Sequence, residues 1–175
     1  MRLQISRRRL GAERGGQMKG EMELLLAVID DAYAGKSWQG SNLRGSIRGL
    51  SPEDAAWRPG PDRHNIWELI LHAAYWKYTV KRKLLGEKRG SFPLKGSNWM
   101  VRPQELTDAA WKADQHLLDG MHQSLRGAVA SLPPGILHQP AGRSKYSYAK
   151  TIYGVAAHDI YHTGQIALIK RLMRS

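Results

Sequence analysis

Apolar residues recur every three or four positions in four long segments of the chain, the spacing of one face of an α-helix. The predicted helices cover residues 20–34, 65–85, 107–132 and 147–173. Asn65 and Glu68 form a capping box at the start of the second of these helices, and Gly86 follows its end. We find no strand pattern of convincing length and no internal repeat. The sequence therefore predicts an all-α fold, a four-helix bundle.

Between these helices lie shorter pieces and one long loop. A short helical segment at residues 42–50 precedes a single turn that begins at Ser51 and Pro52. The loop between Gly86 and Thr107 joins the second and third long helices and is rich in Gly, Pro and Ser. It also contains the apolar residues Phe92, Trp99 and Met100. Because loops of this length in compact domains are usually functional or disordered, this apolar content favours a loop that packs over a site.

The last predicted helix carries two histidines on its apolar face. His158 and His162 fall on the same stripe as Val155 and Ile166, although burial of an imidazole without a partner is costly. Side chains at positions i and i+4 project side by side, so this pair could chelate one ion. His72 lies at the edge of the apolar stripe of the second long helix, and a bundle can bring that position opposite the pair.

Two interpretations of these histidines remain open at the level of sequence. A single histidine on an apolar face is more often a core residue with satisfied hydrogen bonds than a metal ligand. The pair at i and i+4 makes metal binding about as well supported as a core role. His72 adds to the metal interpretation only if the two helices are in register, which the sequence does not show.

Two segments resemble a known family. They are HNIWELILHAAYWKYTVKRKLLG, which contains His72, and GVAAHDIYHTGQIALIKRL near the C-terminus. Both resemble the DinB-like (DinB/YfiT) superfamily, from about Met18 to the end of the chain. The resemblance implies a four-helix bundle, often a homodimer, that binds one divalent metal ion, usually zinc or nickel. The ligands carried over are His72, His158 and His162.

The resemblance also implies a class of chemistry, because better-characterised members are transferases or isomerases that use a low-molecular-weight thiol such as mycothiol or bacillithiol. Three neutral imidazoles leave a metal ion at least one open position, where water or a thiolate can bind. The motif is not that of a zincin, since Asp159 and not glutamate follows His158. Asp159 either orients a ligand imidazole or solvates the helix face. Gln165 either has such an orienting role or packs between helices.

Several aromatic residues are candidates for the wall of a substrate cavity near the histidines. They are Trp76, Trp99, His122 and Tyr153. His122 falls near the apolar stripe of the third long helix, which favours a pocket position. The default role of aromatic residues in a bundle is nevertheless the core. His64 precedes Asn65 and is expected in a loop.

Composition narrows the ligands that a metal ion could have. The chain of 175 residues contains no cysteine, which excludes disulfides, zinc ribbons, iron–sulfur clusters and a cysteine nucleophile. Histidine, aspartate and glutamate are the remaining ligands for a metal, and any thiol in the reaction must come from outside the chain.

The net charge of +12 is concentrated in three segments, at residues 1–16, 77–89 and 170–174. The last two end predicted helices, where cations offset the negative pole of the helix dipole. The stretch 77–89 is thus either a solvated helix end or a recognition site for an anionic substrate. The first segment lacks a pattern. We therefore divide the chain into a basic leader at 1–17, expected to be disordered, and a bundle domain at 18–175.

Three functions fit these observations unequally. The first is a metal-dependent enzyme, a thiol-dependent S-transferase or a hydrolase with a small-molecule substrate. The second is a non-enzymatic bundle that binds a metal or another ligand, in a stress response or as a structural dimer. The third is nucleic-acid binding, which no helix-turn-helix spacing supports. No apolar run could span a bilayer and no signal peptide is present, so we expect a cytoplasmic protein without a membrane partner.

Overall fold

The protein is all-helical in the part of the chain that the structure describes. This computed structural model describes residues 2–88 and 90–174, without the side chains of residues 2–15, 17 and 18. Its elements are α1 (Arg2–Tyr33), α2 (Leu43–Ser46), α3 (Pro52–Ala56), α4 (Ile66–Leu84), α5 (Asp108–Ala130), the 3-10 helix η1 (Pro134–Ile136) and α6 (Tyr148–Leu172). These described ranges contain no strand, and the all-α prediction is confirmed.

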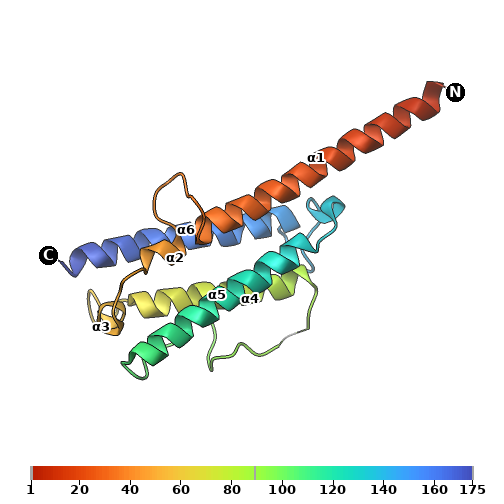
Figure 1. Ribbon diagram of the computed structural model, residues 1–175. Coiled ribbons are helices and arrows are strands. Elements are labelled where there is room, and N and C mark those ends of the chain that lie inside the picture. The colour runs from red at the N-terminus through yellow and green to blue at the C-terminus, as the bar shows by residue number, and fades with distance from the viewer. Residues whose placement is uncertain (1, 89, 175) are drawn as a thin grey trace.

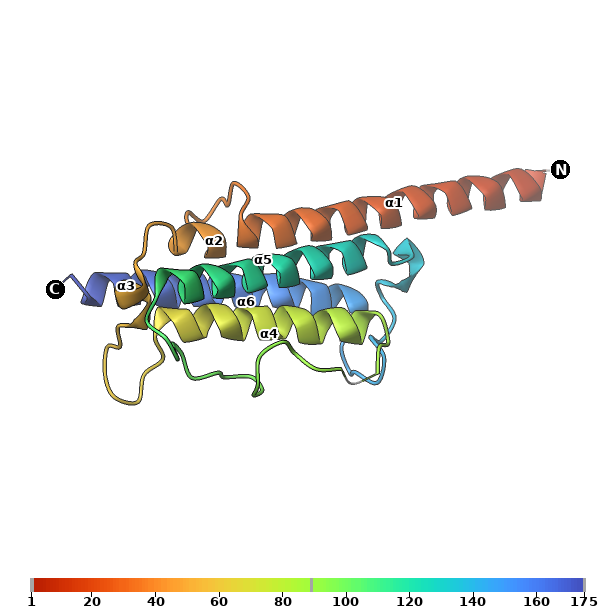
Figure 2. The ribbon, with the colours of Figure 1, turned by 60° about the horizontal axis from the view of Figure 1, so that its bottom comes forward.

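The four long helices pack along one another (Figure 1 and Figure 2). Helix α1 contacts α6, α6 contacts α4, α4 contacts α5, and α5 returns to α1, so that each long helix has two long neighbours. The short helix α2 packs on α6 and α3 packs on α4. None of the described helices is long and apolar enough to cross a membrane.

Local sequence signals place the starts of these helices. The Asn65 side chain accepts a hydrogen bond from the Glu68 backbone N–H at 2.8 Å, as predicted for the start of α4. The other half of the predicted capping box is wrong, because the Glu68 carboxylate binds Arg58 and His64 instead of returning to Asn65. Ser147 caps α6 in the same way, accepting a hydrogen bond from the Lys150 N–H at 3.2 Å.

Two boundaries differ from the sequence prediction. Helix α1 begins at Arg2 and not near residue 20, and the segment predicted at 42–50 contains only one short helix, Leu43–Ser46. The side chains of residues 2–15 lie outside the described part of the structure. The division into a leader at 1–17 and a domain at 18–175 stays a prediction.

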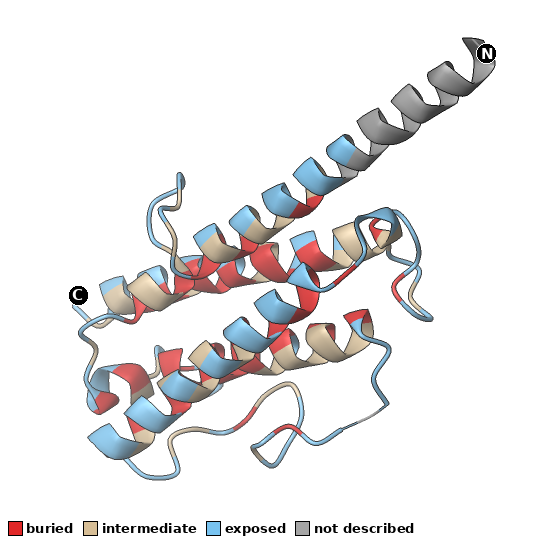
Figure 3. Cartoon of the chain, turned by 45° about the vertical axis from the view of Figure 1, so that its right-hand side comes forward, coloured by how far each residue is buried: buried red, intermediate tan, exposed pale blue. Residues whose placement is uncertain are grey.

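The core surrounds α4, the helix that carries His72. Every residue from Ile66 to Ala74 is buried, which requires neighbours on all sides of this half of the helix (Figure 3). Helices α5 and α6 cover two sides. The segment between α4 and α5 adds Phe92 and Met100, both buried in the same hydrophobic cluster. The N-terminal half of α4 is therefore a rigid support for the polar side chains that it carries.

Candidate metal centre

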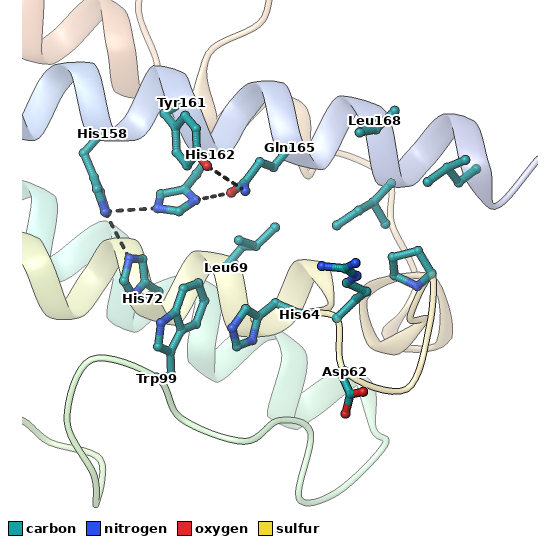
Figure 4. Close-up of a pocket in the computed structure, with 14 residues that line it drawn as sticks. Asp62, His64, Leu69, His72, Trp99, His158, Tyr161, His162, Gln165 and Leu168 are labelled. Atoms are coloured by element: carbon teal, nitrogen blue, oxygen red, sulfur yellow. Dashed lines mark hydrogen bonds between the residues drawn. The ribbon is translucent and has the colours of Figure 1, made fainter.

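Three imidazoles from two helices meet at one point. His72 comes from α4, and His158 and His162 come from α6 (Figure 4). The Nε2 atom of His158 lies 3.1 Å from Nε2 of His72 and 3.0 Å from Nε2 of His162. Ligand atoms of all three residues lie within 4.8 Å of one another. Helices α4 and α6 are thus in the register that metal binding by these three residues requires.

The donor spacing fits a small divalent ion. Imidazole nitrogens bind zinc at about 2.0–2.1 Å, and two of them at a tetrahedral angle are then about 3.3 Å apart. The observed distances of 3.0 and 3.1 Å are close to this value. Only a small adjustment of the side chains would separate the donors around such an ion.

Hydrogen bonds on the far side of two rings fix which nitrogen faces the centre. Nδ1 of His72 lies 2.9 Å from the backbone carbonyl oxygen of Asn98, which can only accept, so Nδ1 carries the hydrogen. Nδ1 of His162 donates to Oε1 of Gln165 at 2.6 Å. Both rings therefore direct an Nε2 lone pair at His158. Partners of this kind are typical of metal-binding histidines.

His158 lacks such a partner, and its position makes the cluster unfavourable without a cation. Its Nε2 can donate one hydrogen, to either His72 or His162 but not to both. At least two lone pairs then face each other. Its buried Nδ1 has no hydrogen-bond partner within the described residues. A cation at the centre would turn the repulsion among these acceptors into attraction.

Burial keeps all three imidazoles neutral at neutral pH. It lowers the pKa of His72 to about 4, and the pKa of His158 to about 3 with a further contribution from the other two histidines. The pKa of His162 is lowered for the same principal reason. Only the neutral ring can bind a metal ion, so the environment favours the form that binds.

The segment between α4 and α5 holds His72 in place. The Trp99 indole is sandwiched between two imidazoles, with ring centroids 3.8 Å from His72 and 3.6 Å from His64. Asn98 has a left-handed backbone with φ of 63°, and its side-chain oxygen accepts a hydrogen bond from Trp76 Nε1 at 2.9 Å. The sequence analysis missed Asn98 and gave His64 only a loop position. The signal for Asn98 is its residue type, since asparagine tolerates this conformation.

The interpretations offered for Asp159 are wrong. Its side chain is buried at 1 % exposure, so it does not solvate a helix face. Its carboxylate forms an ion pair with the Lys77 ammonium and hydrogen-bonds none of the three histidines. Gln165 does orient a candidate ligand, through its bond to His162, and its amide also donates to the Tyr161 hydroxyl at 3.3 Å.

The four candidate wall residues separate into two pairs. Trp76 and Trp99 both lie against His72. His122 stacks on Tyr33 with ring centroids 3.8 Å apart, and Tyr153 is 60 % exposed. Neither His122 nor Tyr153 lines a cavity that reaches the three histidines.

Two cavities reach the candidate centre. The Trp99 cavity, of about 680 Å³, is lined by all three histidines together with Trp99, His64, Tyr161 and Gln165 (Figure 4). The lysine cavity, of about 710 Å³, is lined by His72 and His158 together with Trp76, Lys83 and Lys150. Both volumes are in the range of small-molecule sites. His72 and His158 are common to the two cavities, so the centre is accessible from both.

Comparison with known proteins adds the family. A family model described as the DinB superfamily matches residues 37–166, well over half of the chain. The match includes His72, His158 and His162. No curated protein and no solved structure matches the chain. The chain belongs to the DinB superfamily.

Proposed function

We propose that this protein is a metal-dependent enzyme whose divalent ion, zinc or nickel, is held by His72, His158 and His162. The observation that carries the proposal is the convergence of three Nε2 atoms, two of them directed by hydrogen bonds on the opposite ring nitrogen. A bound ion would lower the pKa of a coordinated water or thiol. Three protein ligands leave room for that fourth group.

The residues around the histidines supply orientation and a dry environment. Asn98 and Gln165 hold the rings of His72 and His162. Trp99 covers one face of His72 and separates it from His64. The two cavities bring small molecules to the centre from different directions. They favour an enzyme over a purely structural ion, which needs no cavity.

The proposed reaction class is thiol transfer or hydrolysis of a small molecule. The chain contains no cysteine, so a thiol nucleophile would be a low-molecular-weight thiol. Neither a cysteine nor a glutamate lines either cavity, so proton transfer would rely on solvent or on the ion's own ligand.

We also propose that the four long helices form the four-helix bundle typical of the DinB/YfiT type, and that the protein is a homodimer. The exposed side chains Tyr153, Tyr161 and Leu168 on α6 support a dimer, because a second chain would cover them. Sedimentation of the full chain tests this, and a monomer at micromolar concentration would refute it.

The metal proposal is tested by metal analysis of the full chain and two histidine variants. We expect about one zinc or nickel ion per chain after loading and dialysis. His158→Ala should weaken binding by more than about 100-fold, since even residues that only orient ligands contribute about 10–100-fold. The matched control is His138→Ala, because His138 is exposed and pairs with Glu21 far from the centre.

Two results would refute the metal centre. One is a wild-type chain that retains neither zinc nor nickel after loading. The other is a His158→Ala variant that retains as much metal as His138→Ala. Addition of EDTA to the loaded wild-type chain should abolish any thiol-transfer or hydrolytic activity found in a substrate screen.

A further inference from the structure

The cations near the C-terminal end of α4 do not act as one solvated group. Lys77 is buried and pairs with Asp159. Lys81 pairs with Glu87 at 2.7 Å. Lys83 forms no ion pair with any described residue, and it lines the lysine cavity. Lys83 is therefore the member of this group whose charge is directed at a cavity and not neutralised by the chain.

A second lysine faces the same cavity from another helix. Lys150 lies in the first turn of α6, where the helix dipole disfavours a cation. Its ammonium lies 5.2 Å from the centre of the Tyr146 ring, and no carboxylate among the described residues pairs with it. Helix stability does not account for a lysine at this position. Its place beside the cavity does.

The rest of the lining suits the carbon skeleton of a ligand. Trp76, Val80 and Val155 form an apolar wall, and His72 and His158 lie at the end that meets the metal centre. No acidic residue lines this cavity. In the Trp99 cavity, by contrast, Asp62 and Arg63 balance each other. The two entrances to the centre thus differ in charge, and only the lysine cavity carries an excess of two cations.

We propose that the lysine cavity binds a small organic anion. Its carboxylate or phosphate group contacts Lys83 and Lys150, its apolar part packs against Trp76 and Val155, and its remaining end lies at His72 and His158. The inference rests on the proposed function for the role of that end in a reaction. The anion binding itself requires no metal ion.

The test measures binding of an apolar anion and of its uncharged analogue to the full chain in EDTA. The anion is 1-anilinonaphthalene-8-sulfonate and the analogue is N-phenyl-1-naphthylamine, which lacks the sulfonate. We expect the variant Lys83→Met/Lys150→Met to bind the anion about tenfold more weakly, with little change for the analogue. The matched control is Lys36→Met/Lys112→Met, which removes the same charge from exposed positions away from the cavity.

Competition identifies the anionic group. Displacement of the sulfonate probe by octanoate but not by octyl phosphate assigns a carboxylate ligand, and the reverse assigns a phosphate ester. Octanol is the neutral control. Equal displacement by all three compounds would overturn the proposal, as would equal loss of probe binding in the two lysine variants.

A measurement on the wild-type chain covers the case in which the double variant does not fold. Acetylation of lysines, followed by mass spectrometry, should be slowed several-fold at Lys83 and Lys150 by the displacing anion and unchanged at Lys36 and Lys112. Equal acetylation with and without the anion would overturn the proposal. A chain that binds no metal but shows this protection would refute the metal enzyme and leave the anion site standing.

Discussion

Two polar clusters are buried between the same long helices, and they differ in how their charges and lone pairs are matched. In the core cluster, Lys77 pairs with Asp159 and lies 5.0 Å from the centre of the Tyr33 ring, which stacks on His122. Each charge there has an opposite charge or a ring beside it. The metal centre instead places three hydrogen-bond acceptors against one another. The core cluster is largely complete within the chain, whereas the metal centre requires a cation.

The two clusters are adjacent along both helices. His72 and Lys77 belong to α4, and His158 and Asp159 are consecutive in α6. Because consecutive residues of a helix point about 100° apart, His158 faces the cavities while Asp159 faces the interior. The ion pair thus joins α4 to α6 next to the position where the imidazoles must meet. The comparison predicts that changes in the core cluster affect stability and that changes in the metal centre affect metal affinity.

The largest effect is expected for Lys77→Met. This change leaves the Asp159 carboxylate buried without its partner, which should lower the free energy of unfolding by about 3–5 kcal/mol. Urea denaturation of the full chain in EDTA measures it. The variant Lys77→Met/Asp159→Leu should regain most of the loss, because apolar pairs often replace buried ion pairs without cost. A single variant within about 1 kcal/mol of the wild type would contradict the central role of this pair.

Acid should weaken the core cluster through His122. Burial lowers the pKa of His122 to about 4, against about 6.5 in an unfolded chain. Between these values the unfolded chain binds a proton that the folded chain does not, so the free energy of unfolding falls as the pH decreases. His122 faces Lys77, Asp30 and Arg126, and these neighbours remain in the variant used. We expect His122→Gln to reduce the fall by on the order of 1 kcal/mol.

The measurement is urea denaturation in EDTA at pH 7 and at pH 5 for both proteins. The three histidines of the metal centre also lose stability in acid, because their pKa values are lowered as well. They contribute equally to both proteins, and the difference reports His122. The same pH dependence in wild type and variant would exclude it as a source of acid sensitivity.

The smallest effect is expected at Asn98, which connects the loop to the metal centre. The variants Asn98→Gly and Asn98→Ala both lose the hydrogen bond from Trp76. Only alanine has to be forced into the left-handed backbone, at a cost of about 1–2 kcal/mol. We therefore expect Asn98→Ala to bind zinc about fivefold more weakly than Asn98→Gly in competition with a chelating dye. Equal zinc affinities would mean that the backbone carbonyl of residue 98 does not position His72.

The sequence predicted the helices that carry the histidines because their apolar periodicity is long and regular. The positions of His158 and His162 on one face of α6 follow from that periodicity alone. The meeting of His72 with this pair depends on how far α4 slides along α6, which packing determines and no single helix records. The resemblance to the family supplied this third ligand.

The errors concern residues whose type suggested solvent. Lys77 was assigned to a basic segment at a helix end, yet it lies in the buried stripe one turn after Ala73 and is fully buried. Trp76 was placed in the stripe, yet it is 38 % exposed. Asp159 was taken as exposed or as a partner of a histidine. Each mistake has the same origin, because the ion pair joins residues 82 positions apart and neither one alone shows that it has a partner.

The distribution of the three histidines along the chain has a consequence for biosynthesis. Two of the three come from α6, the last helix to be translated, and they meet a residue 86 positions earlier. A nascent chain in which α4 and α5 have already folded still offers a single imidazole. An ion could therefore be captured only after α6 has docked, and once captured it would hold the last helix to be added against the middle of the chain.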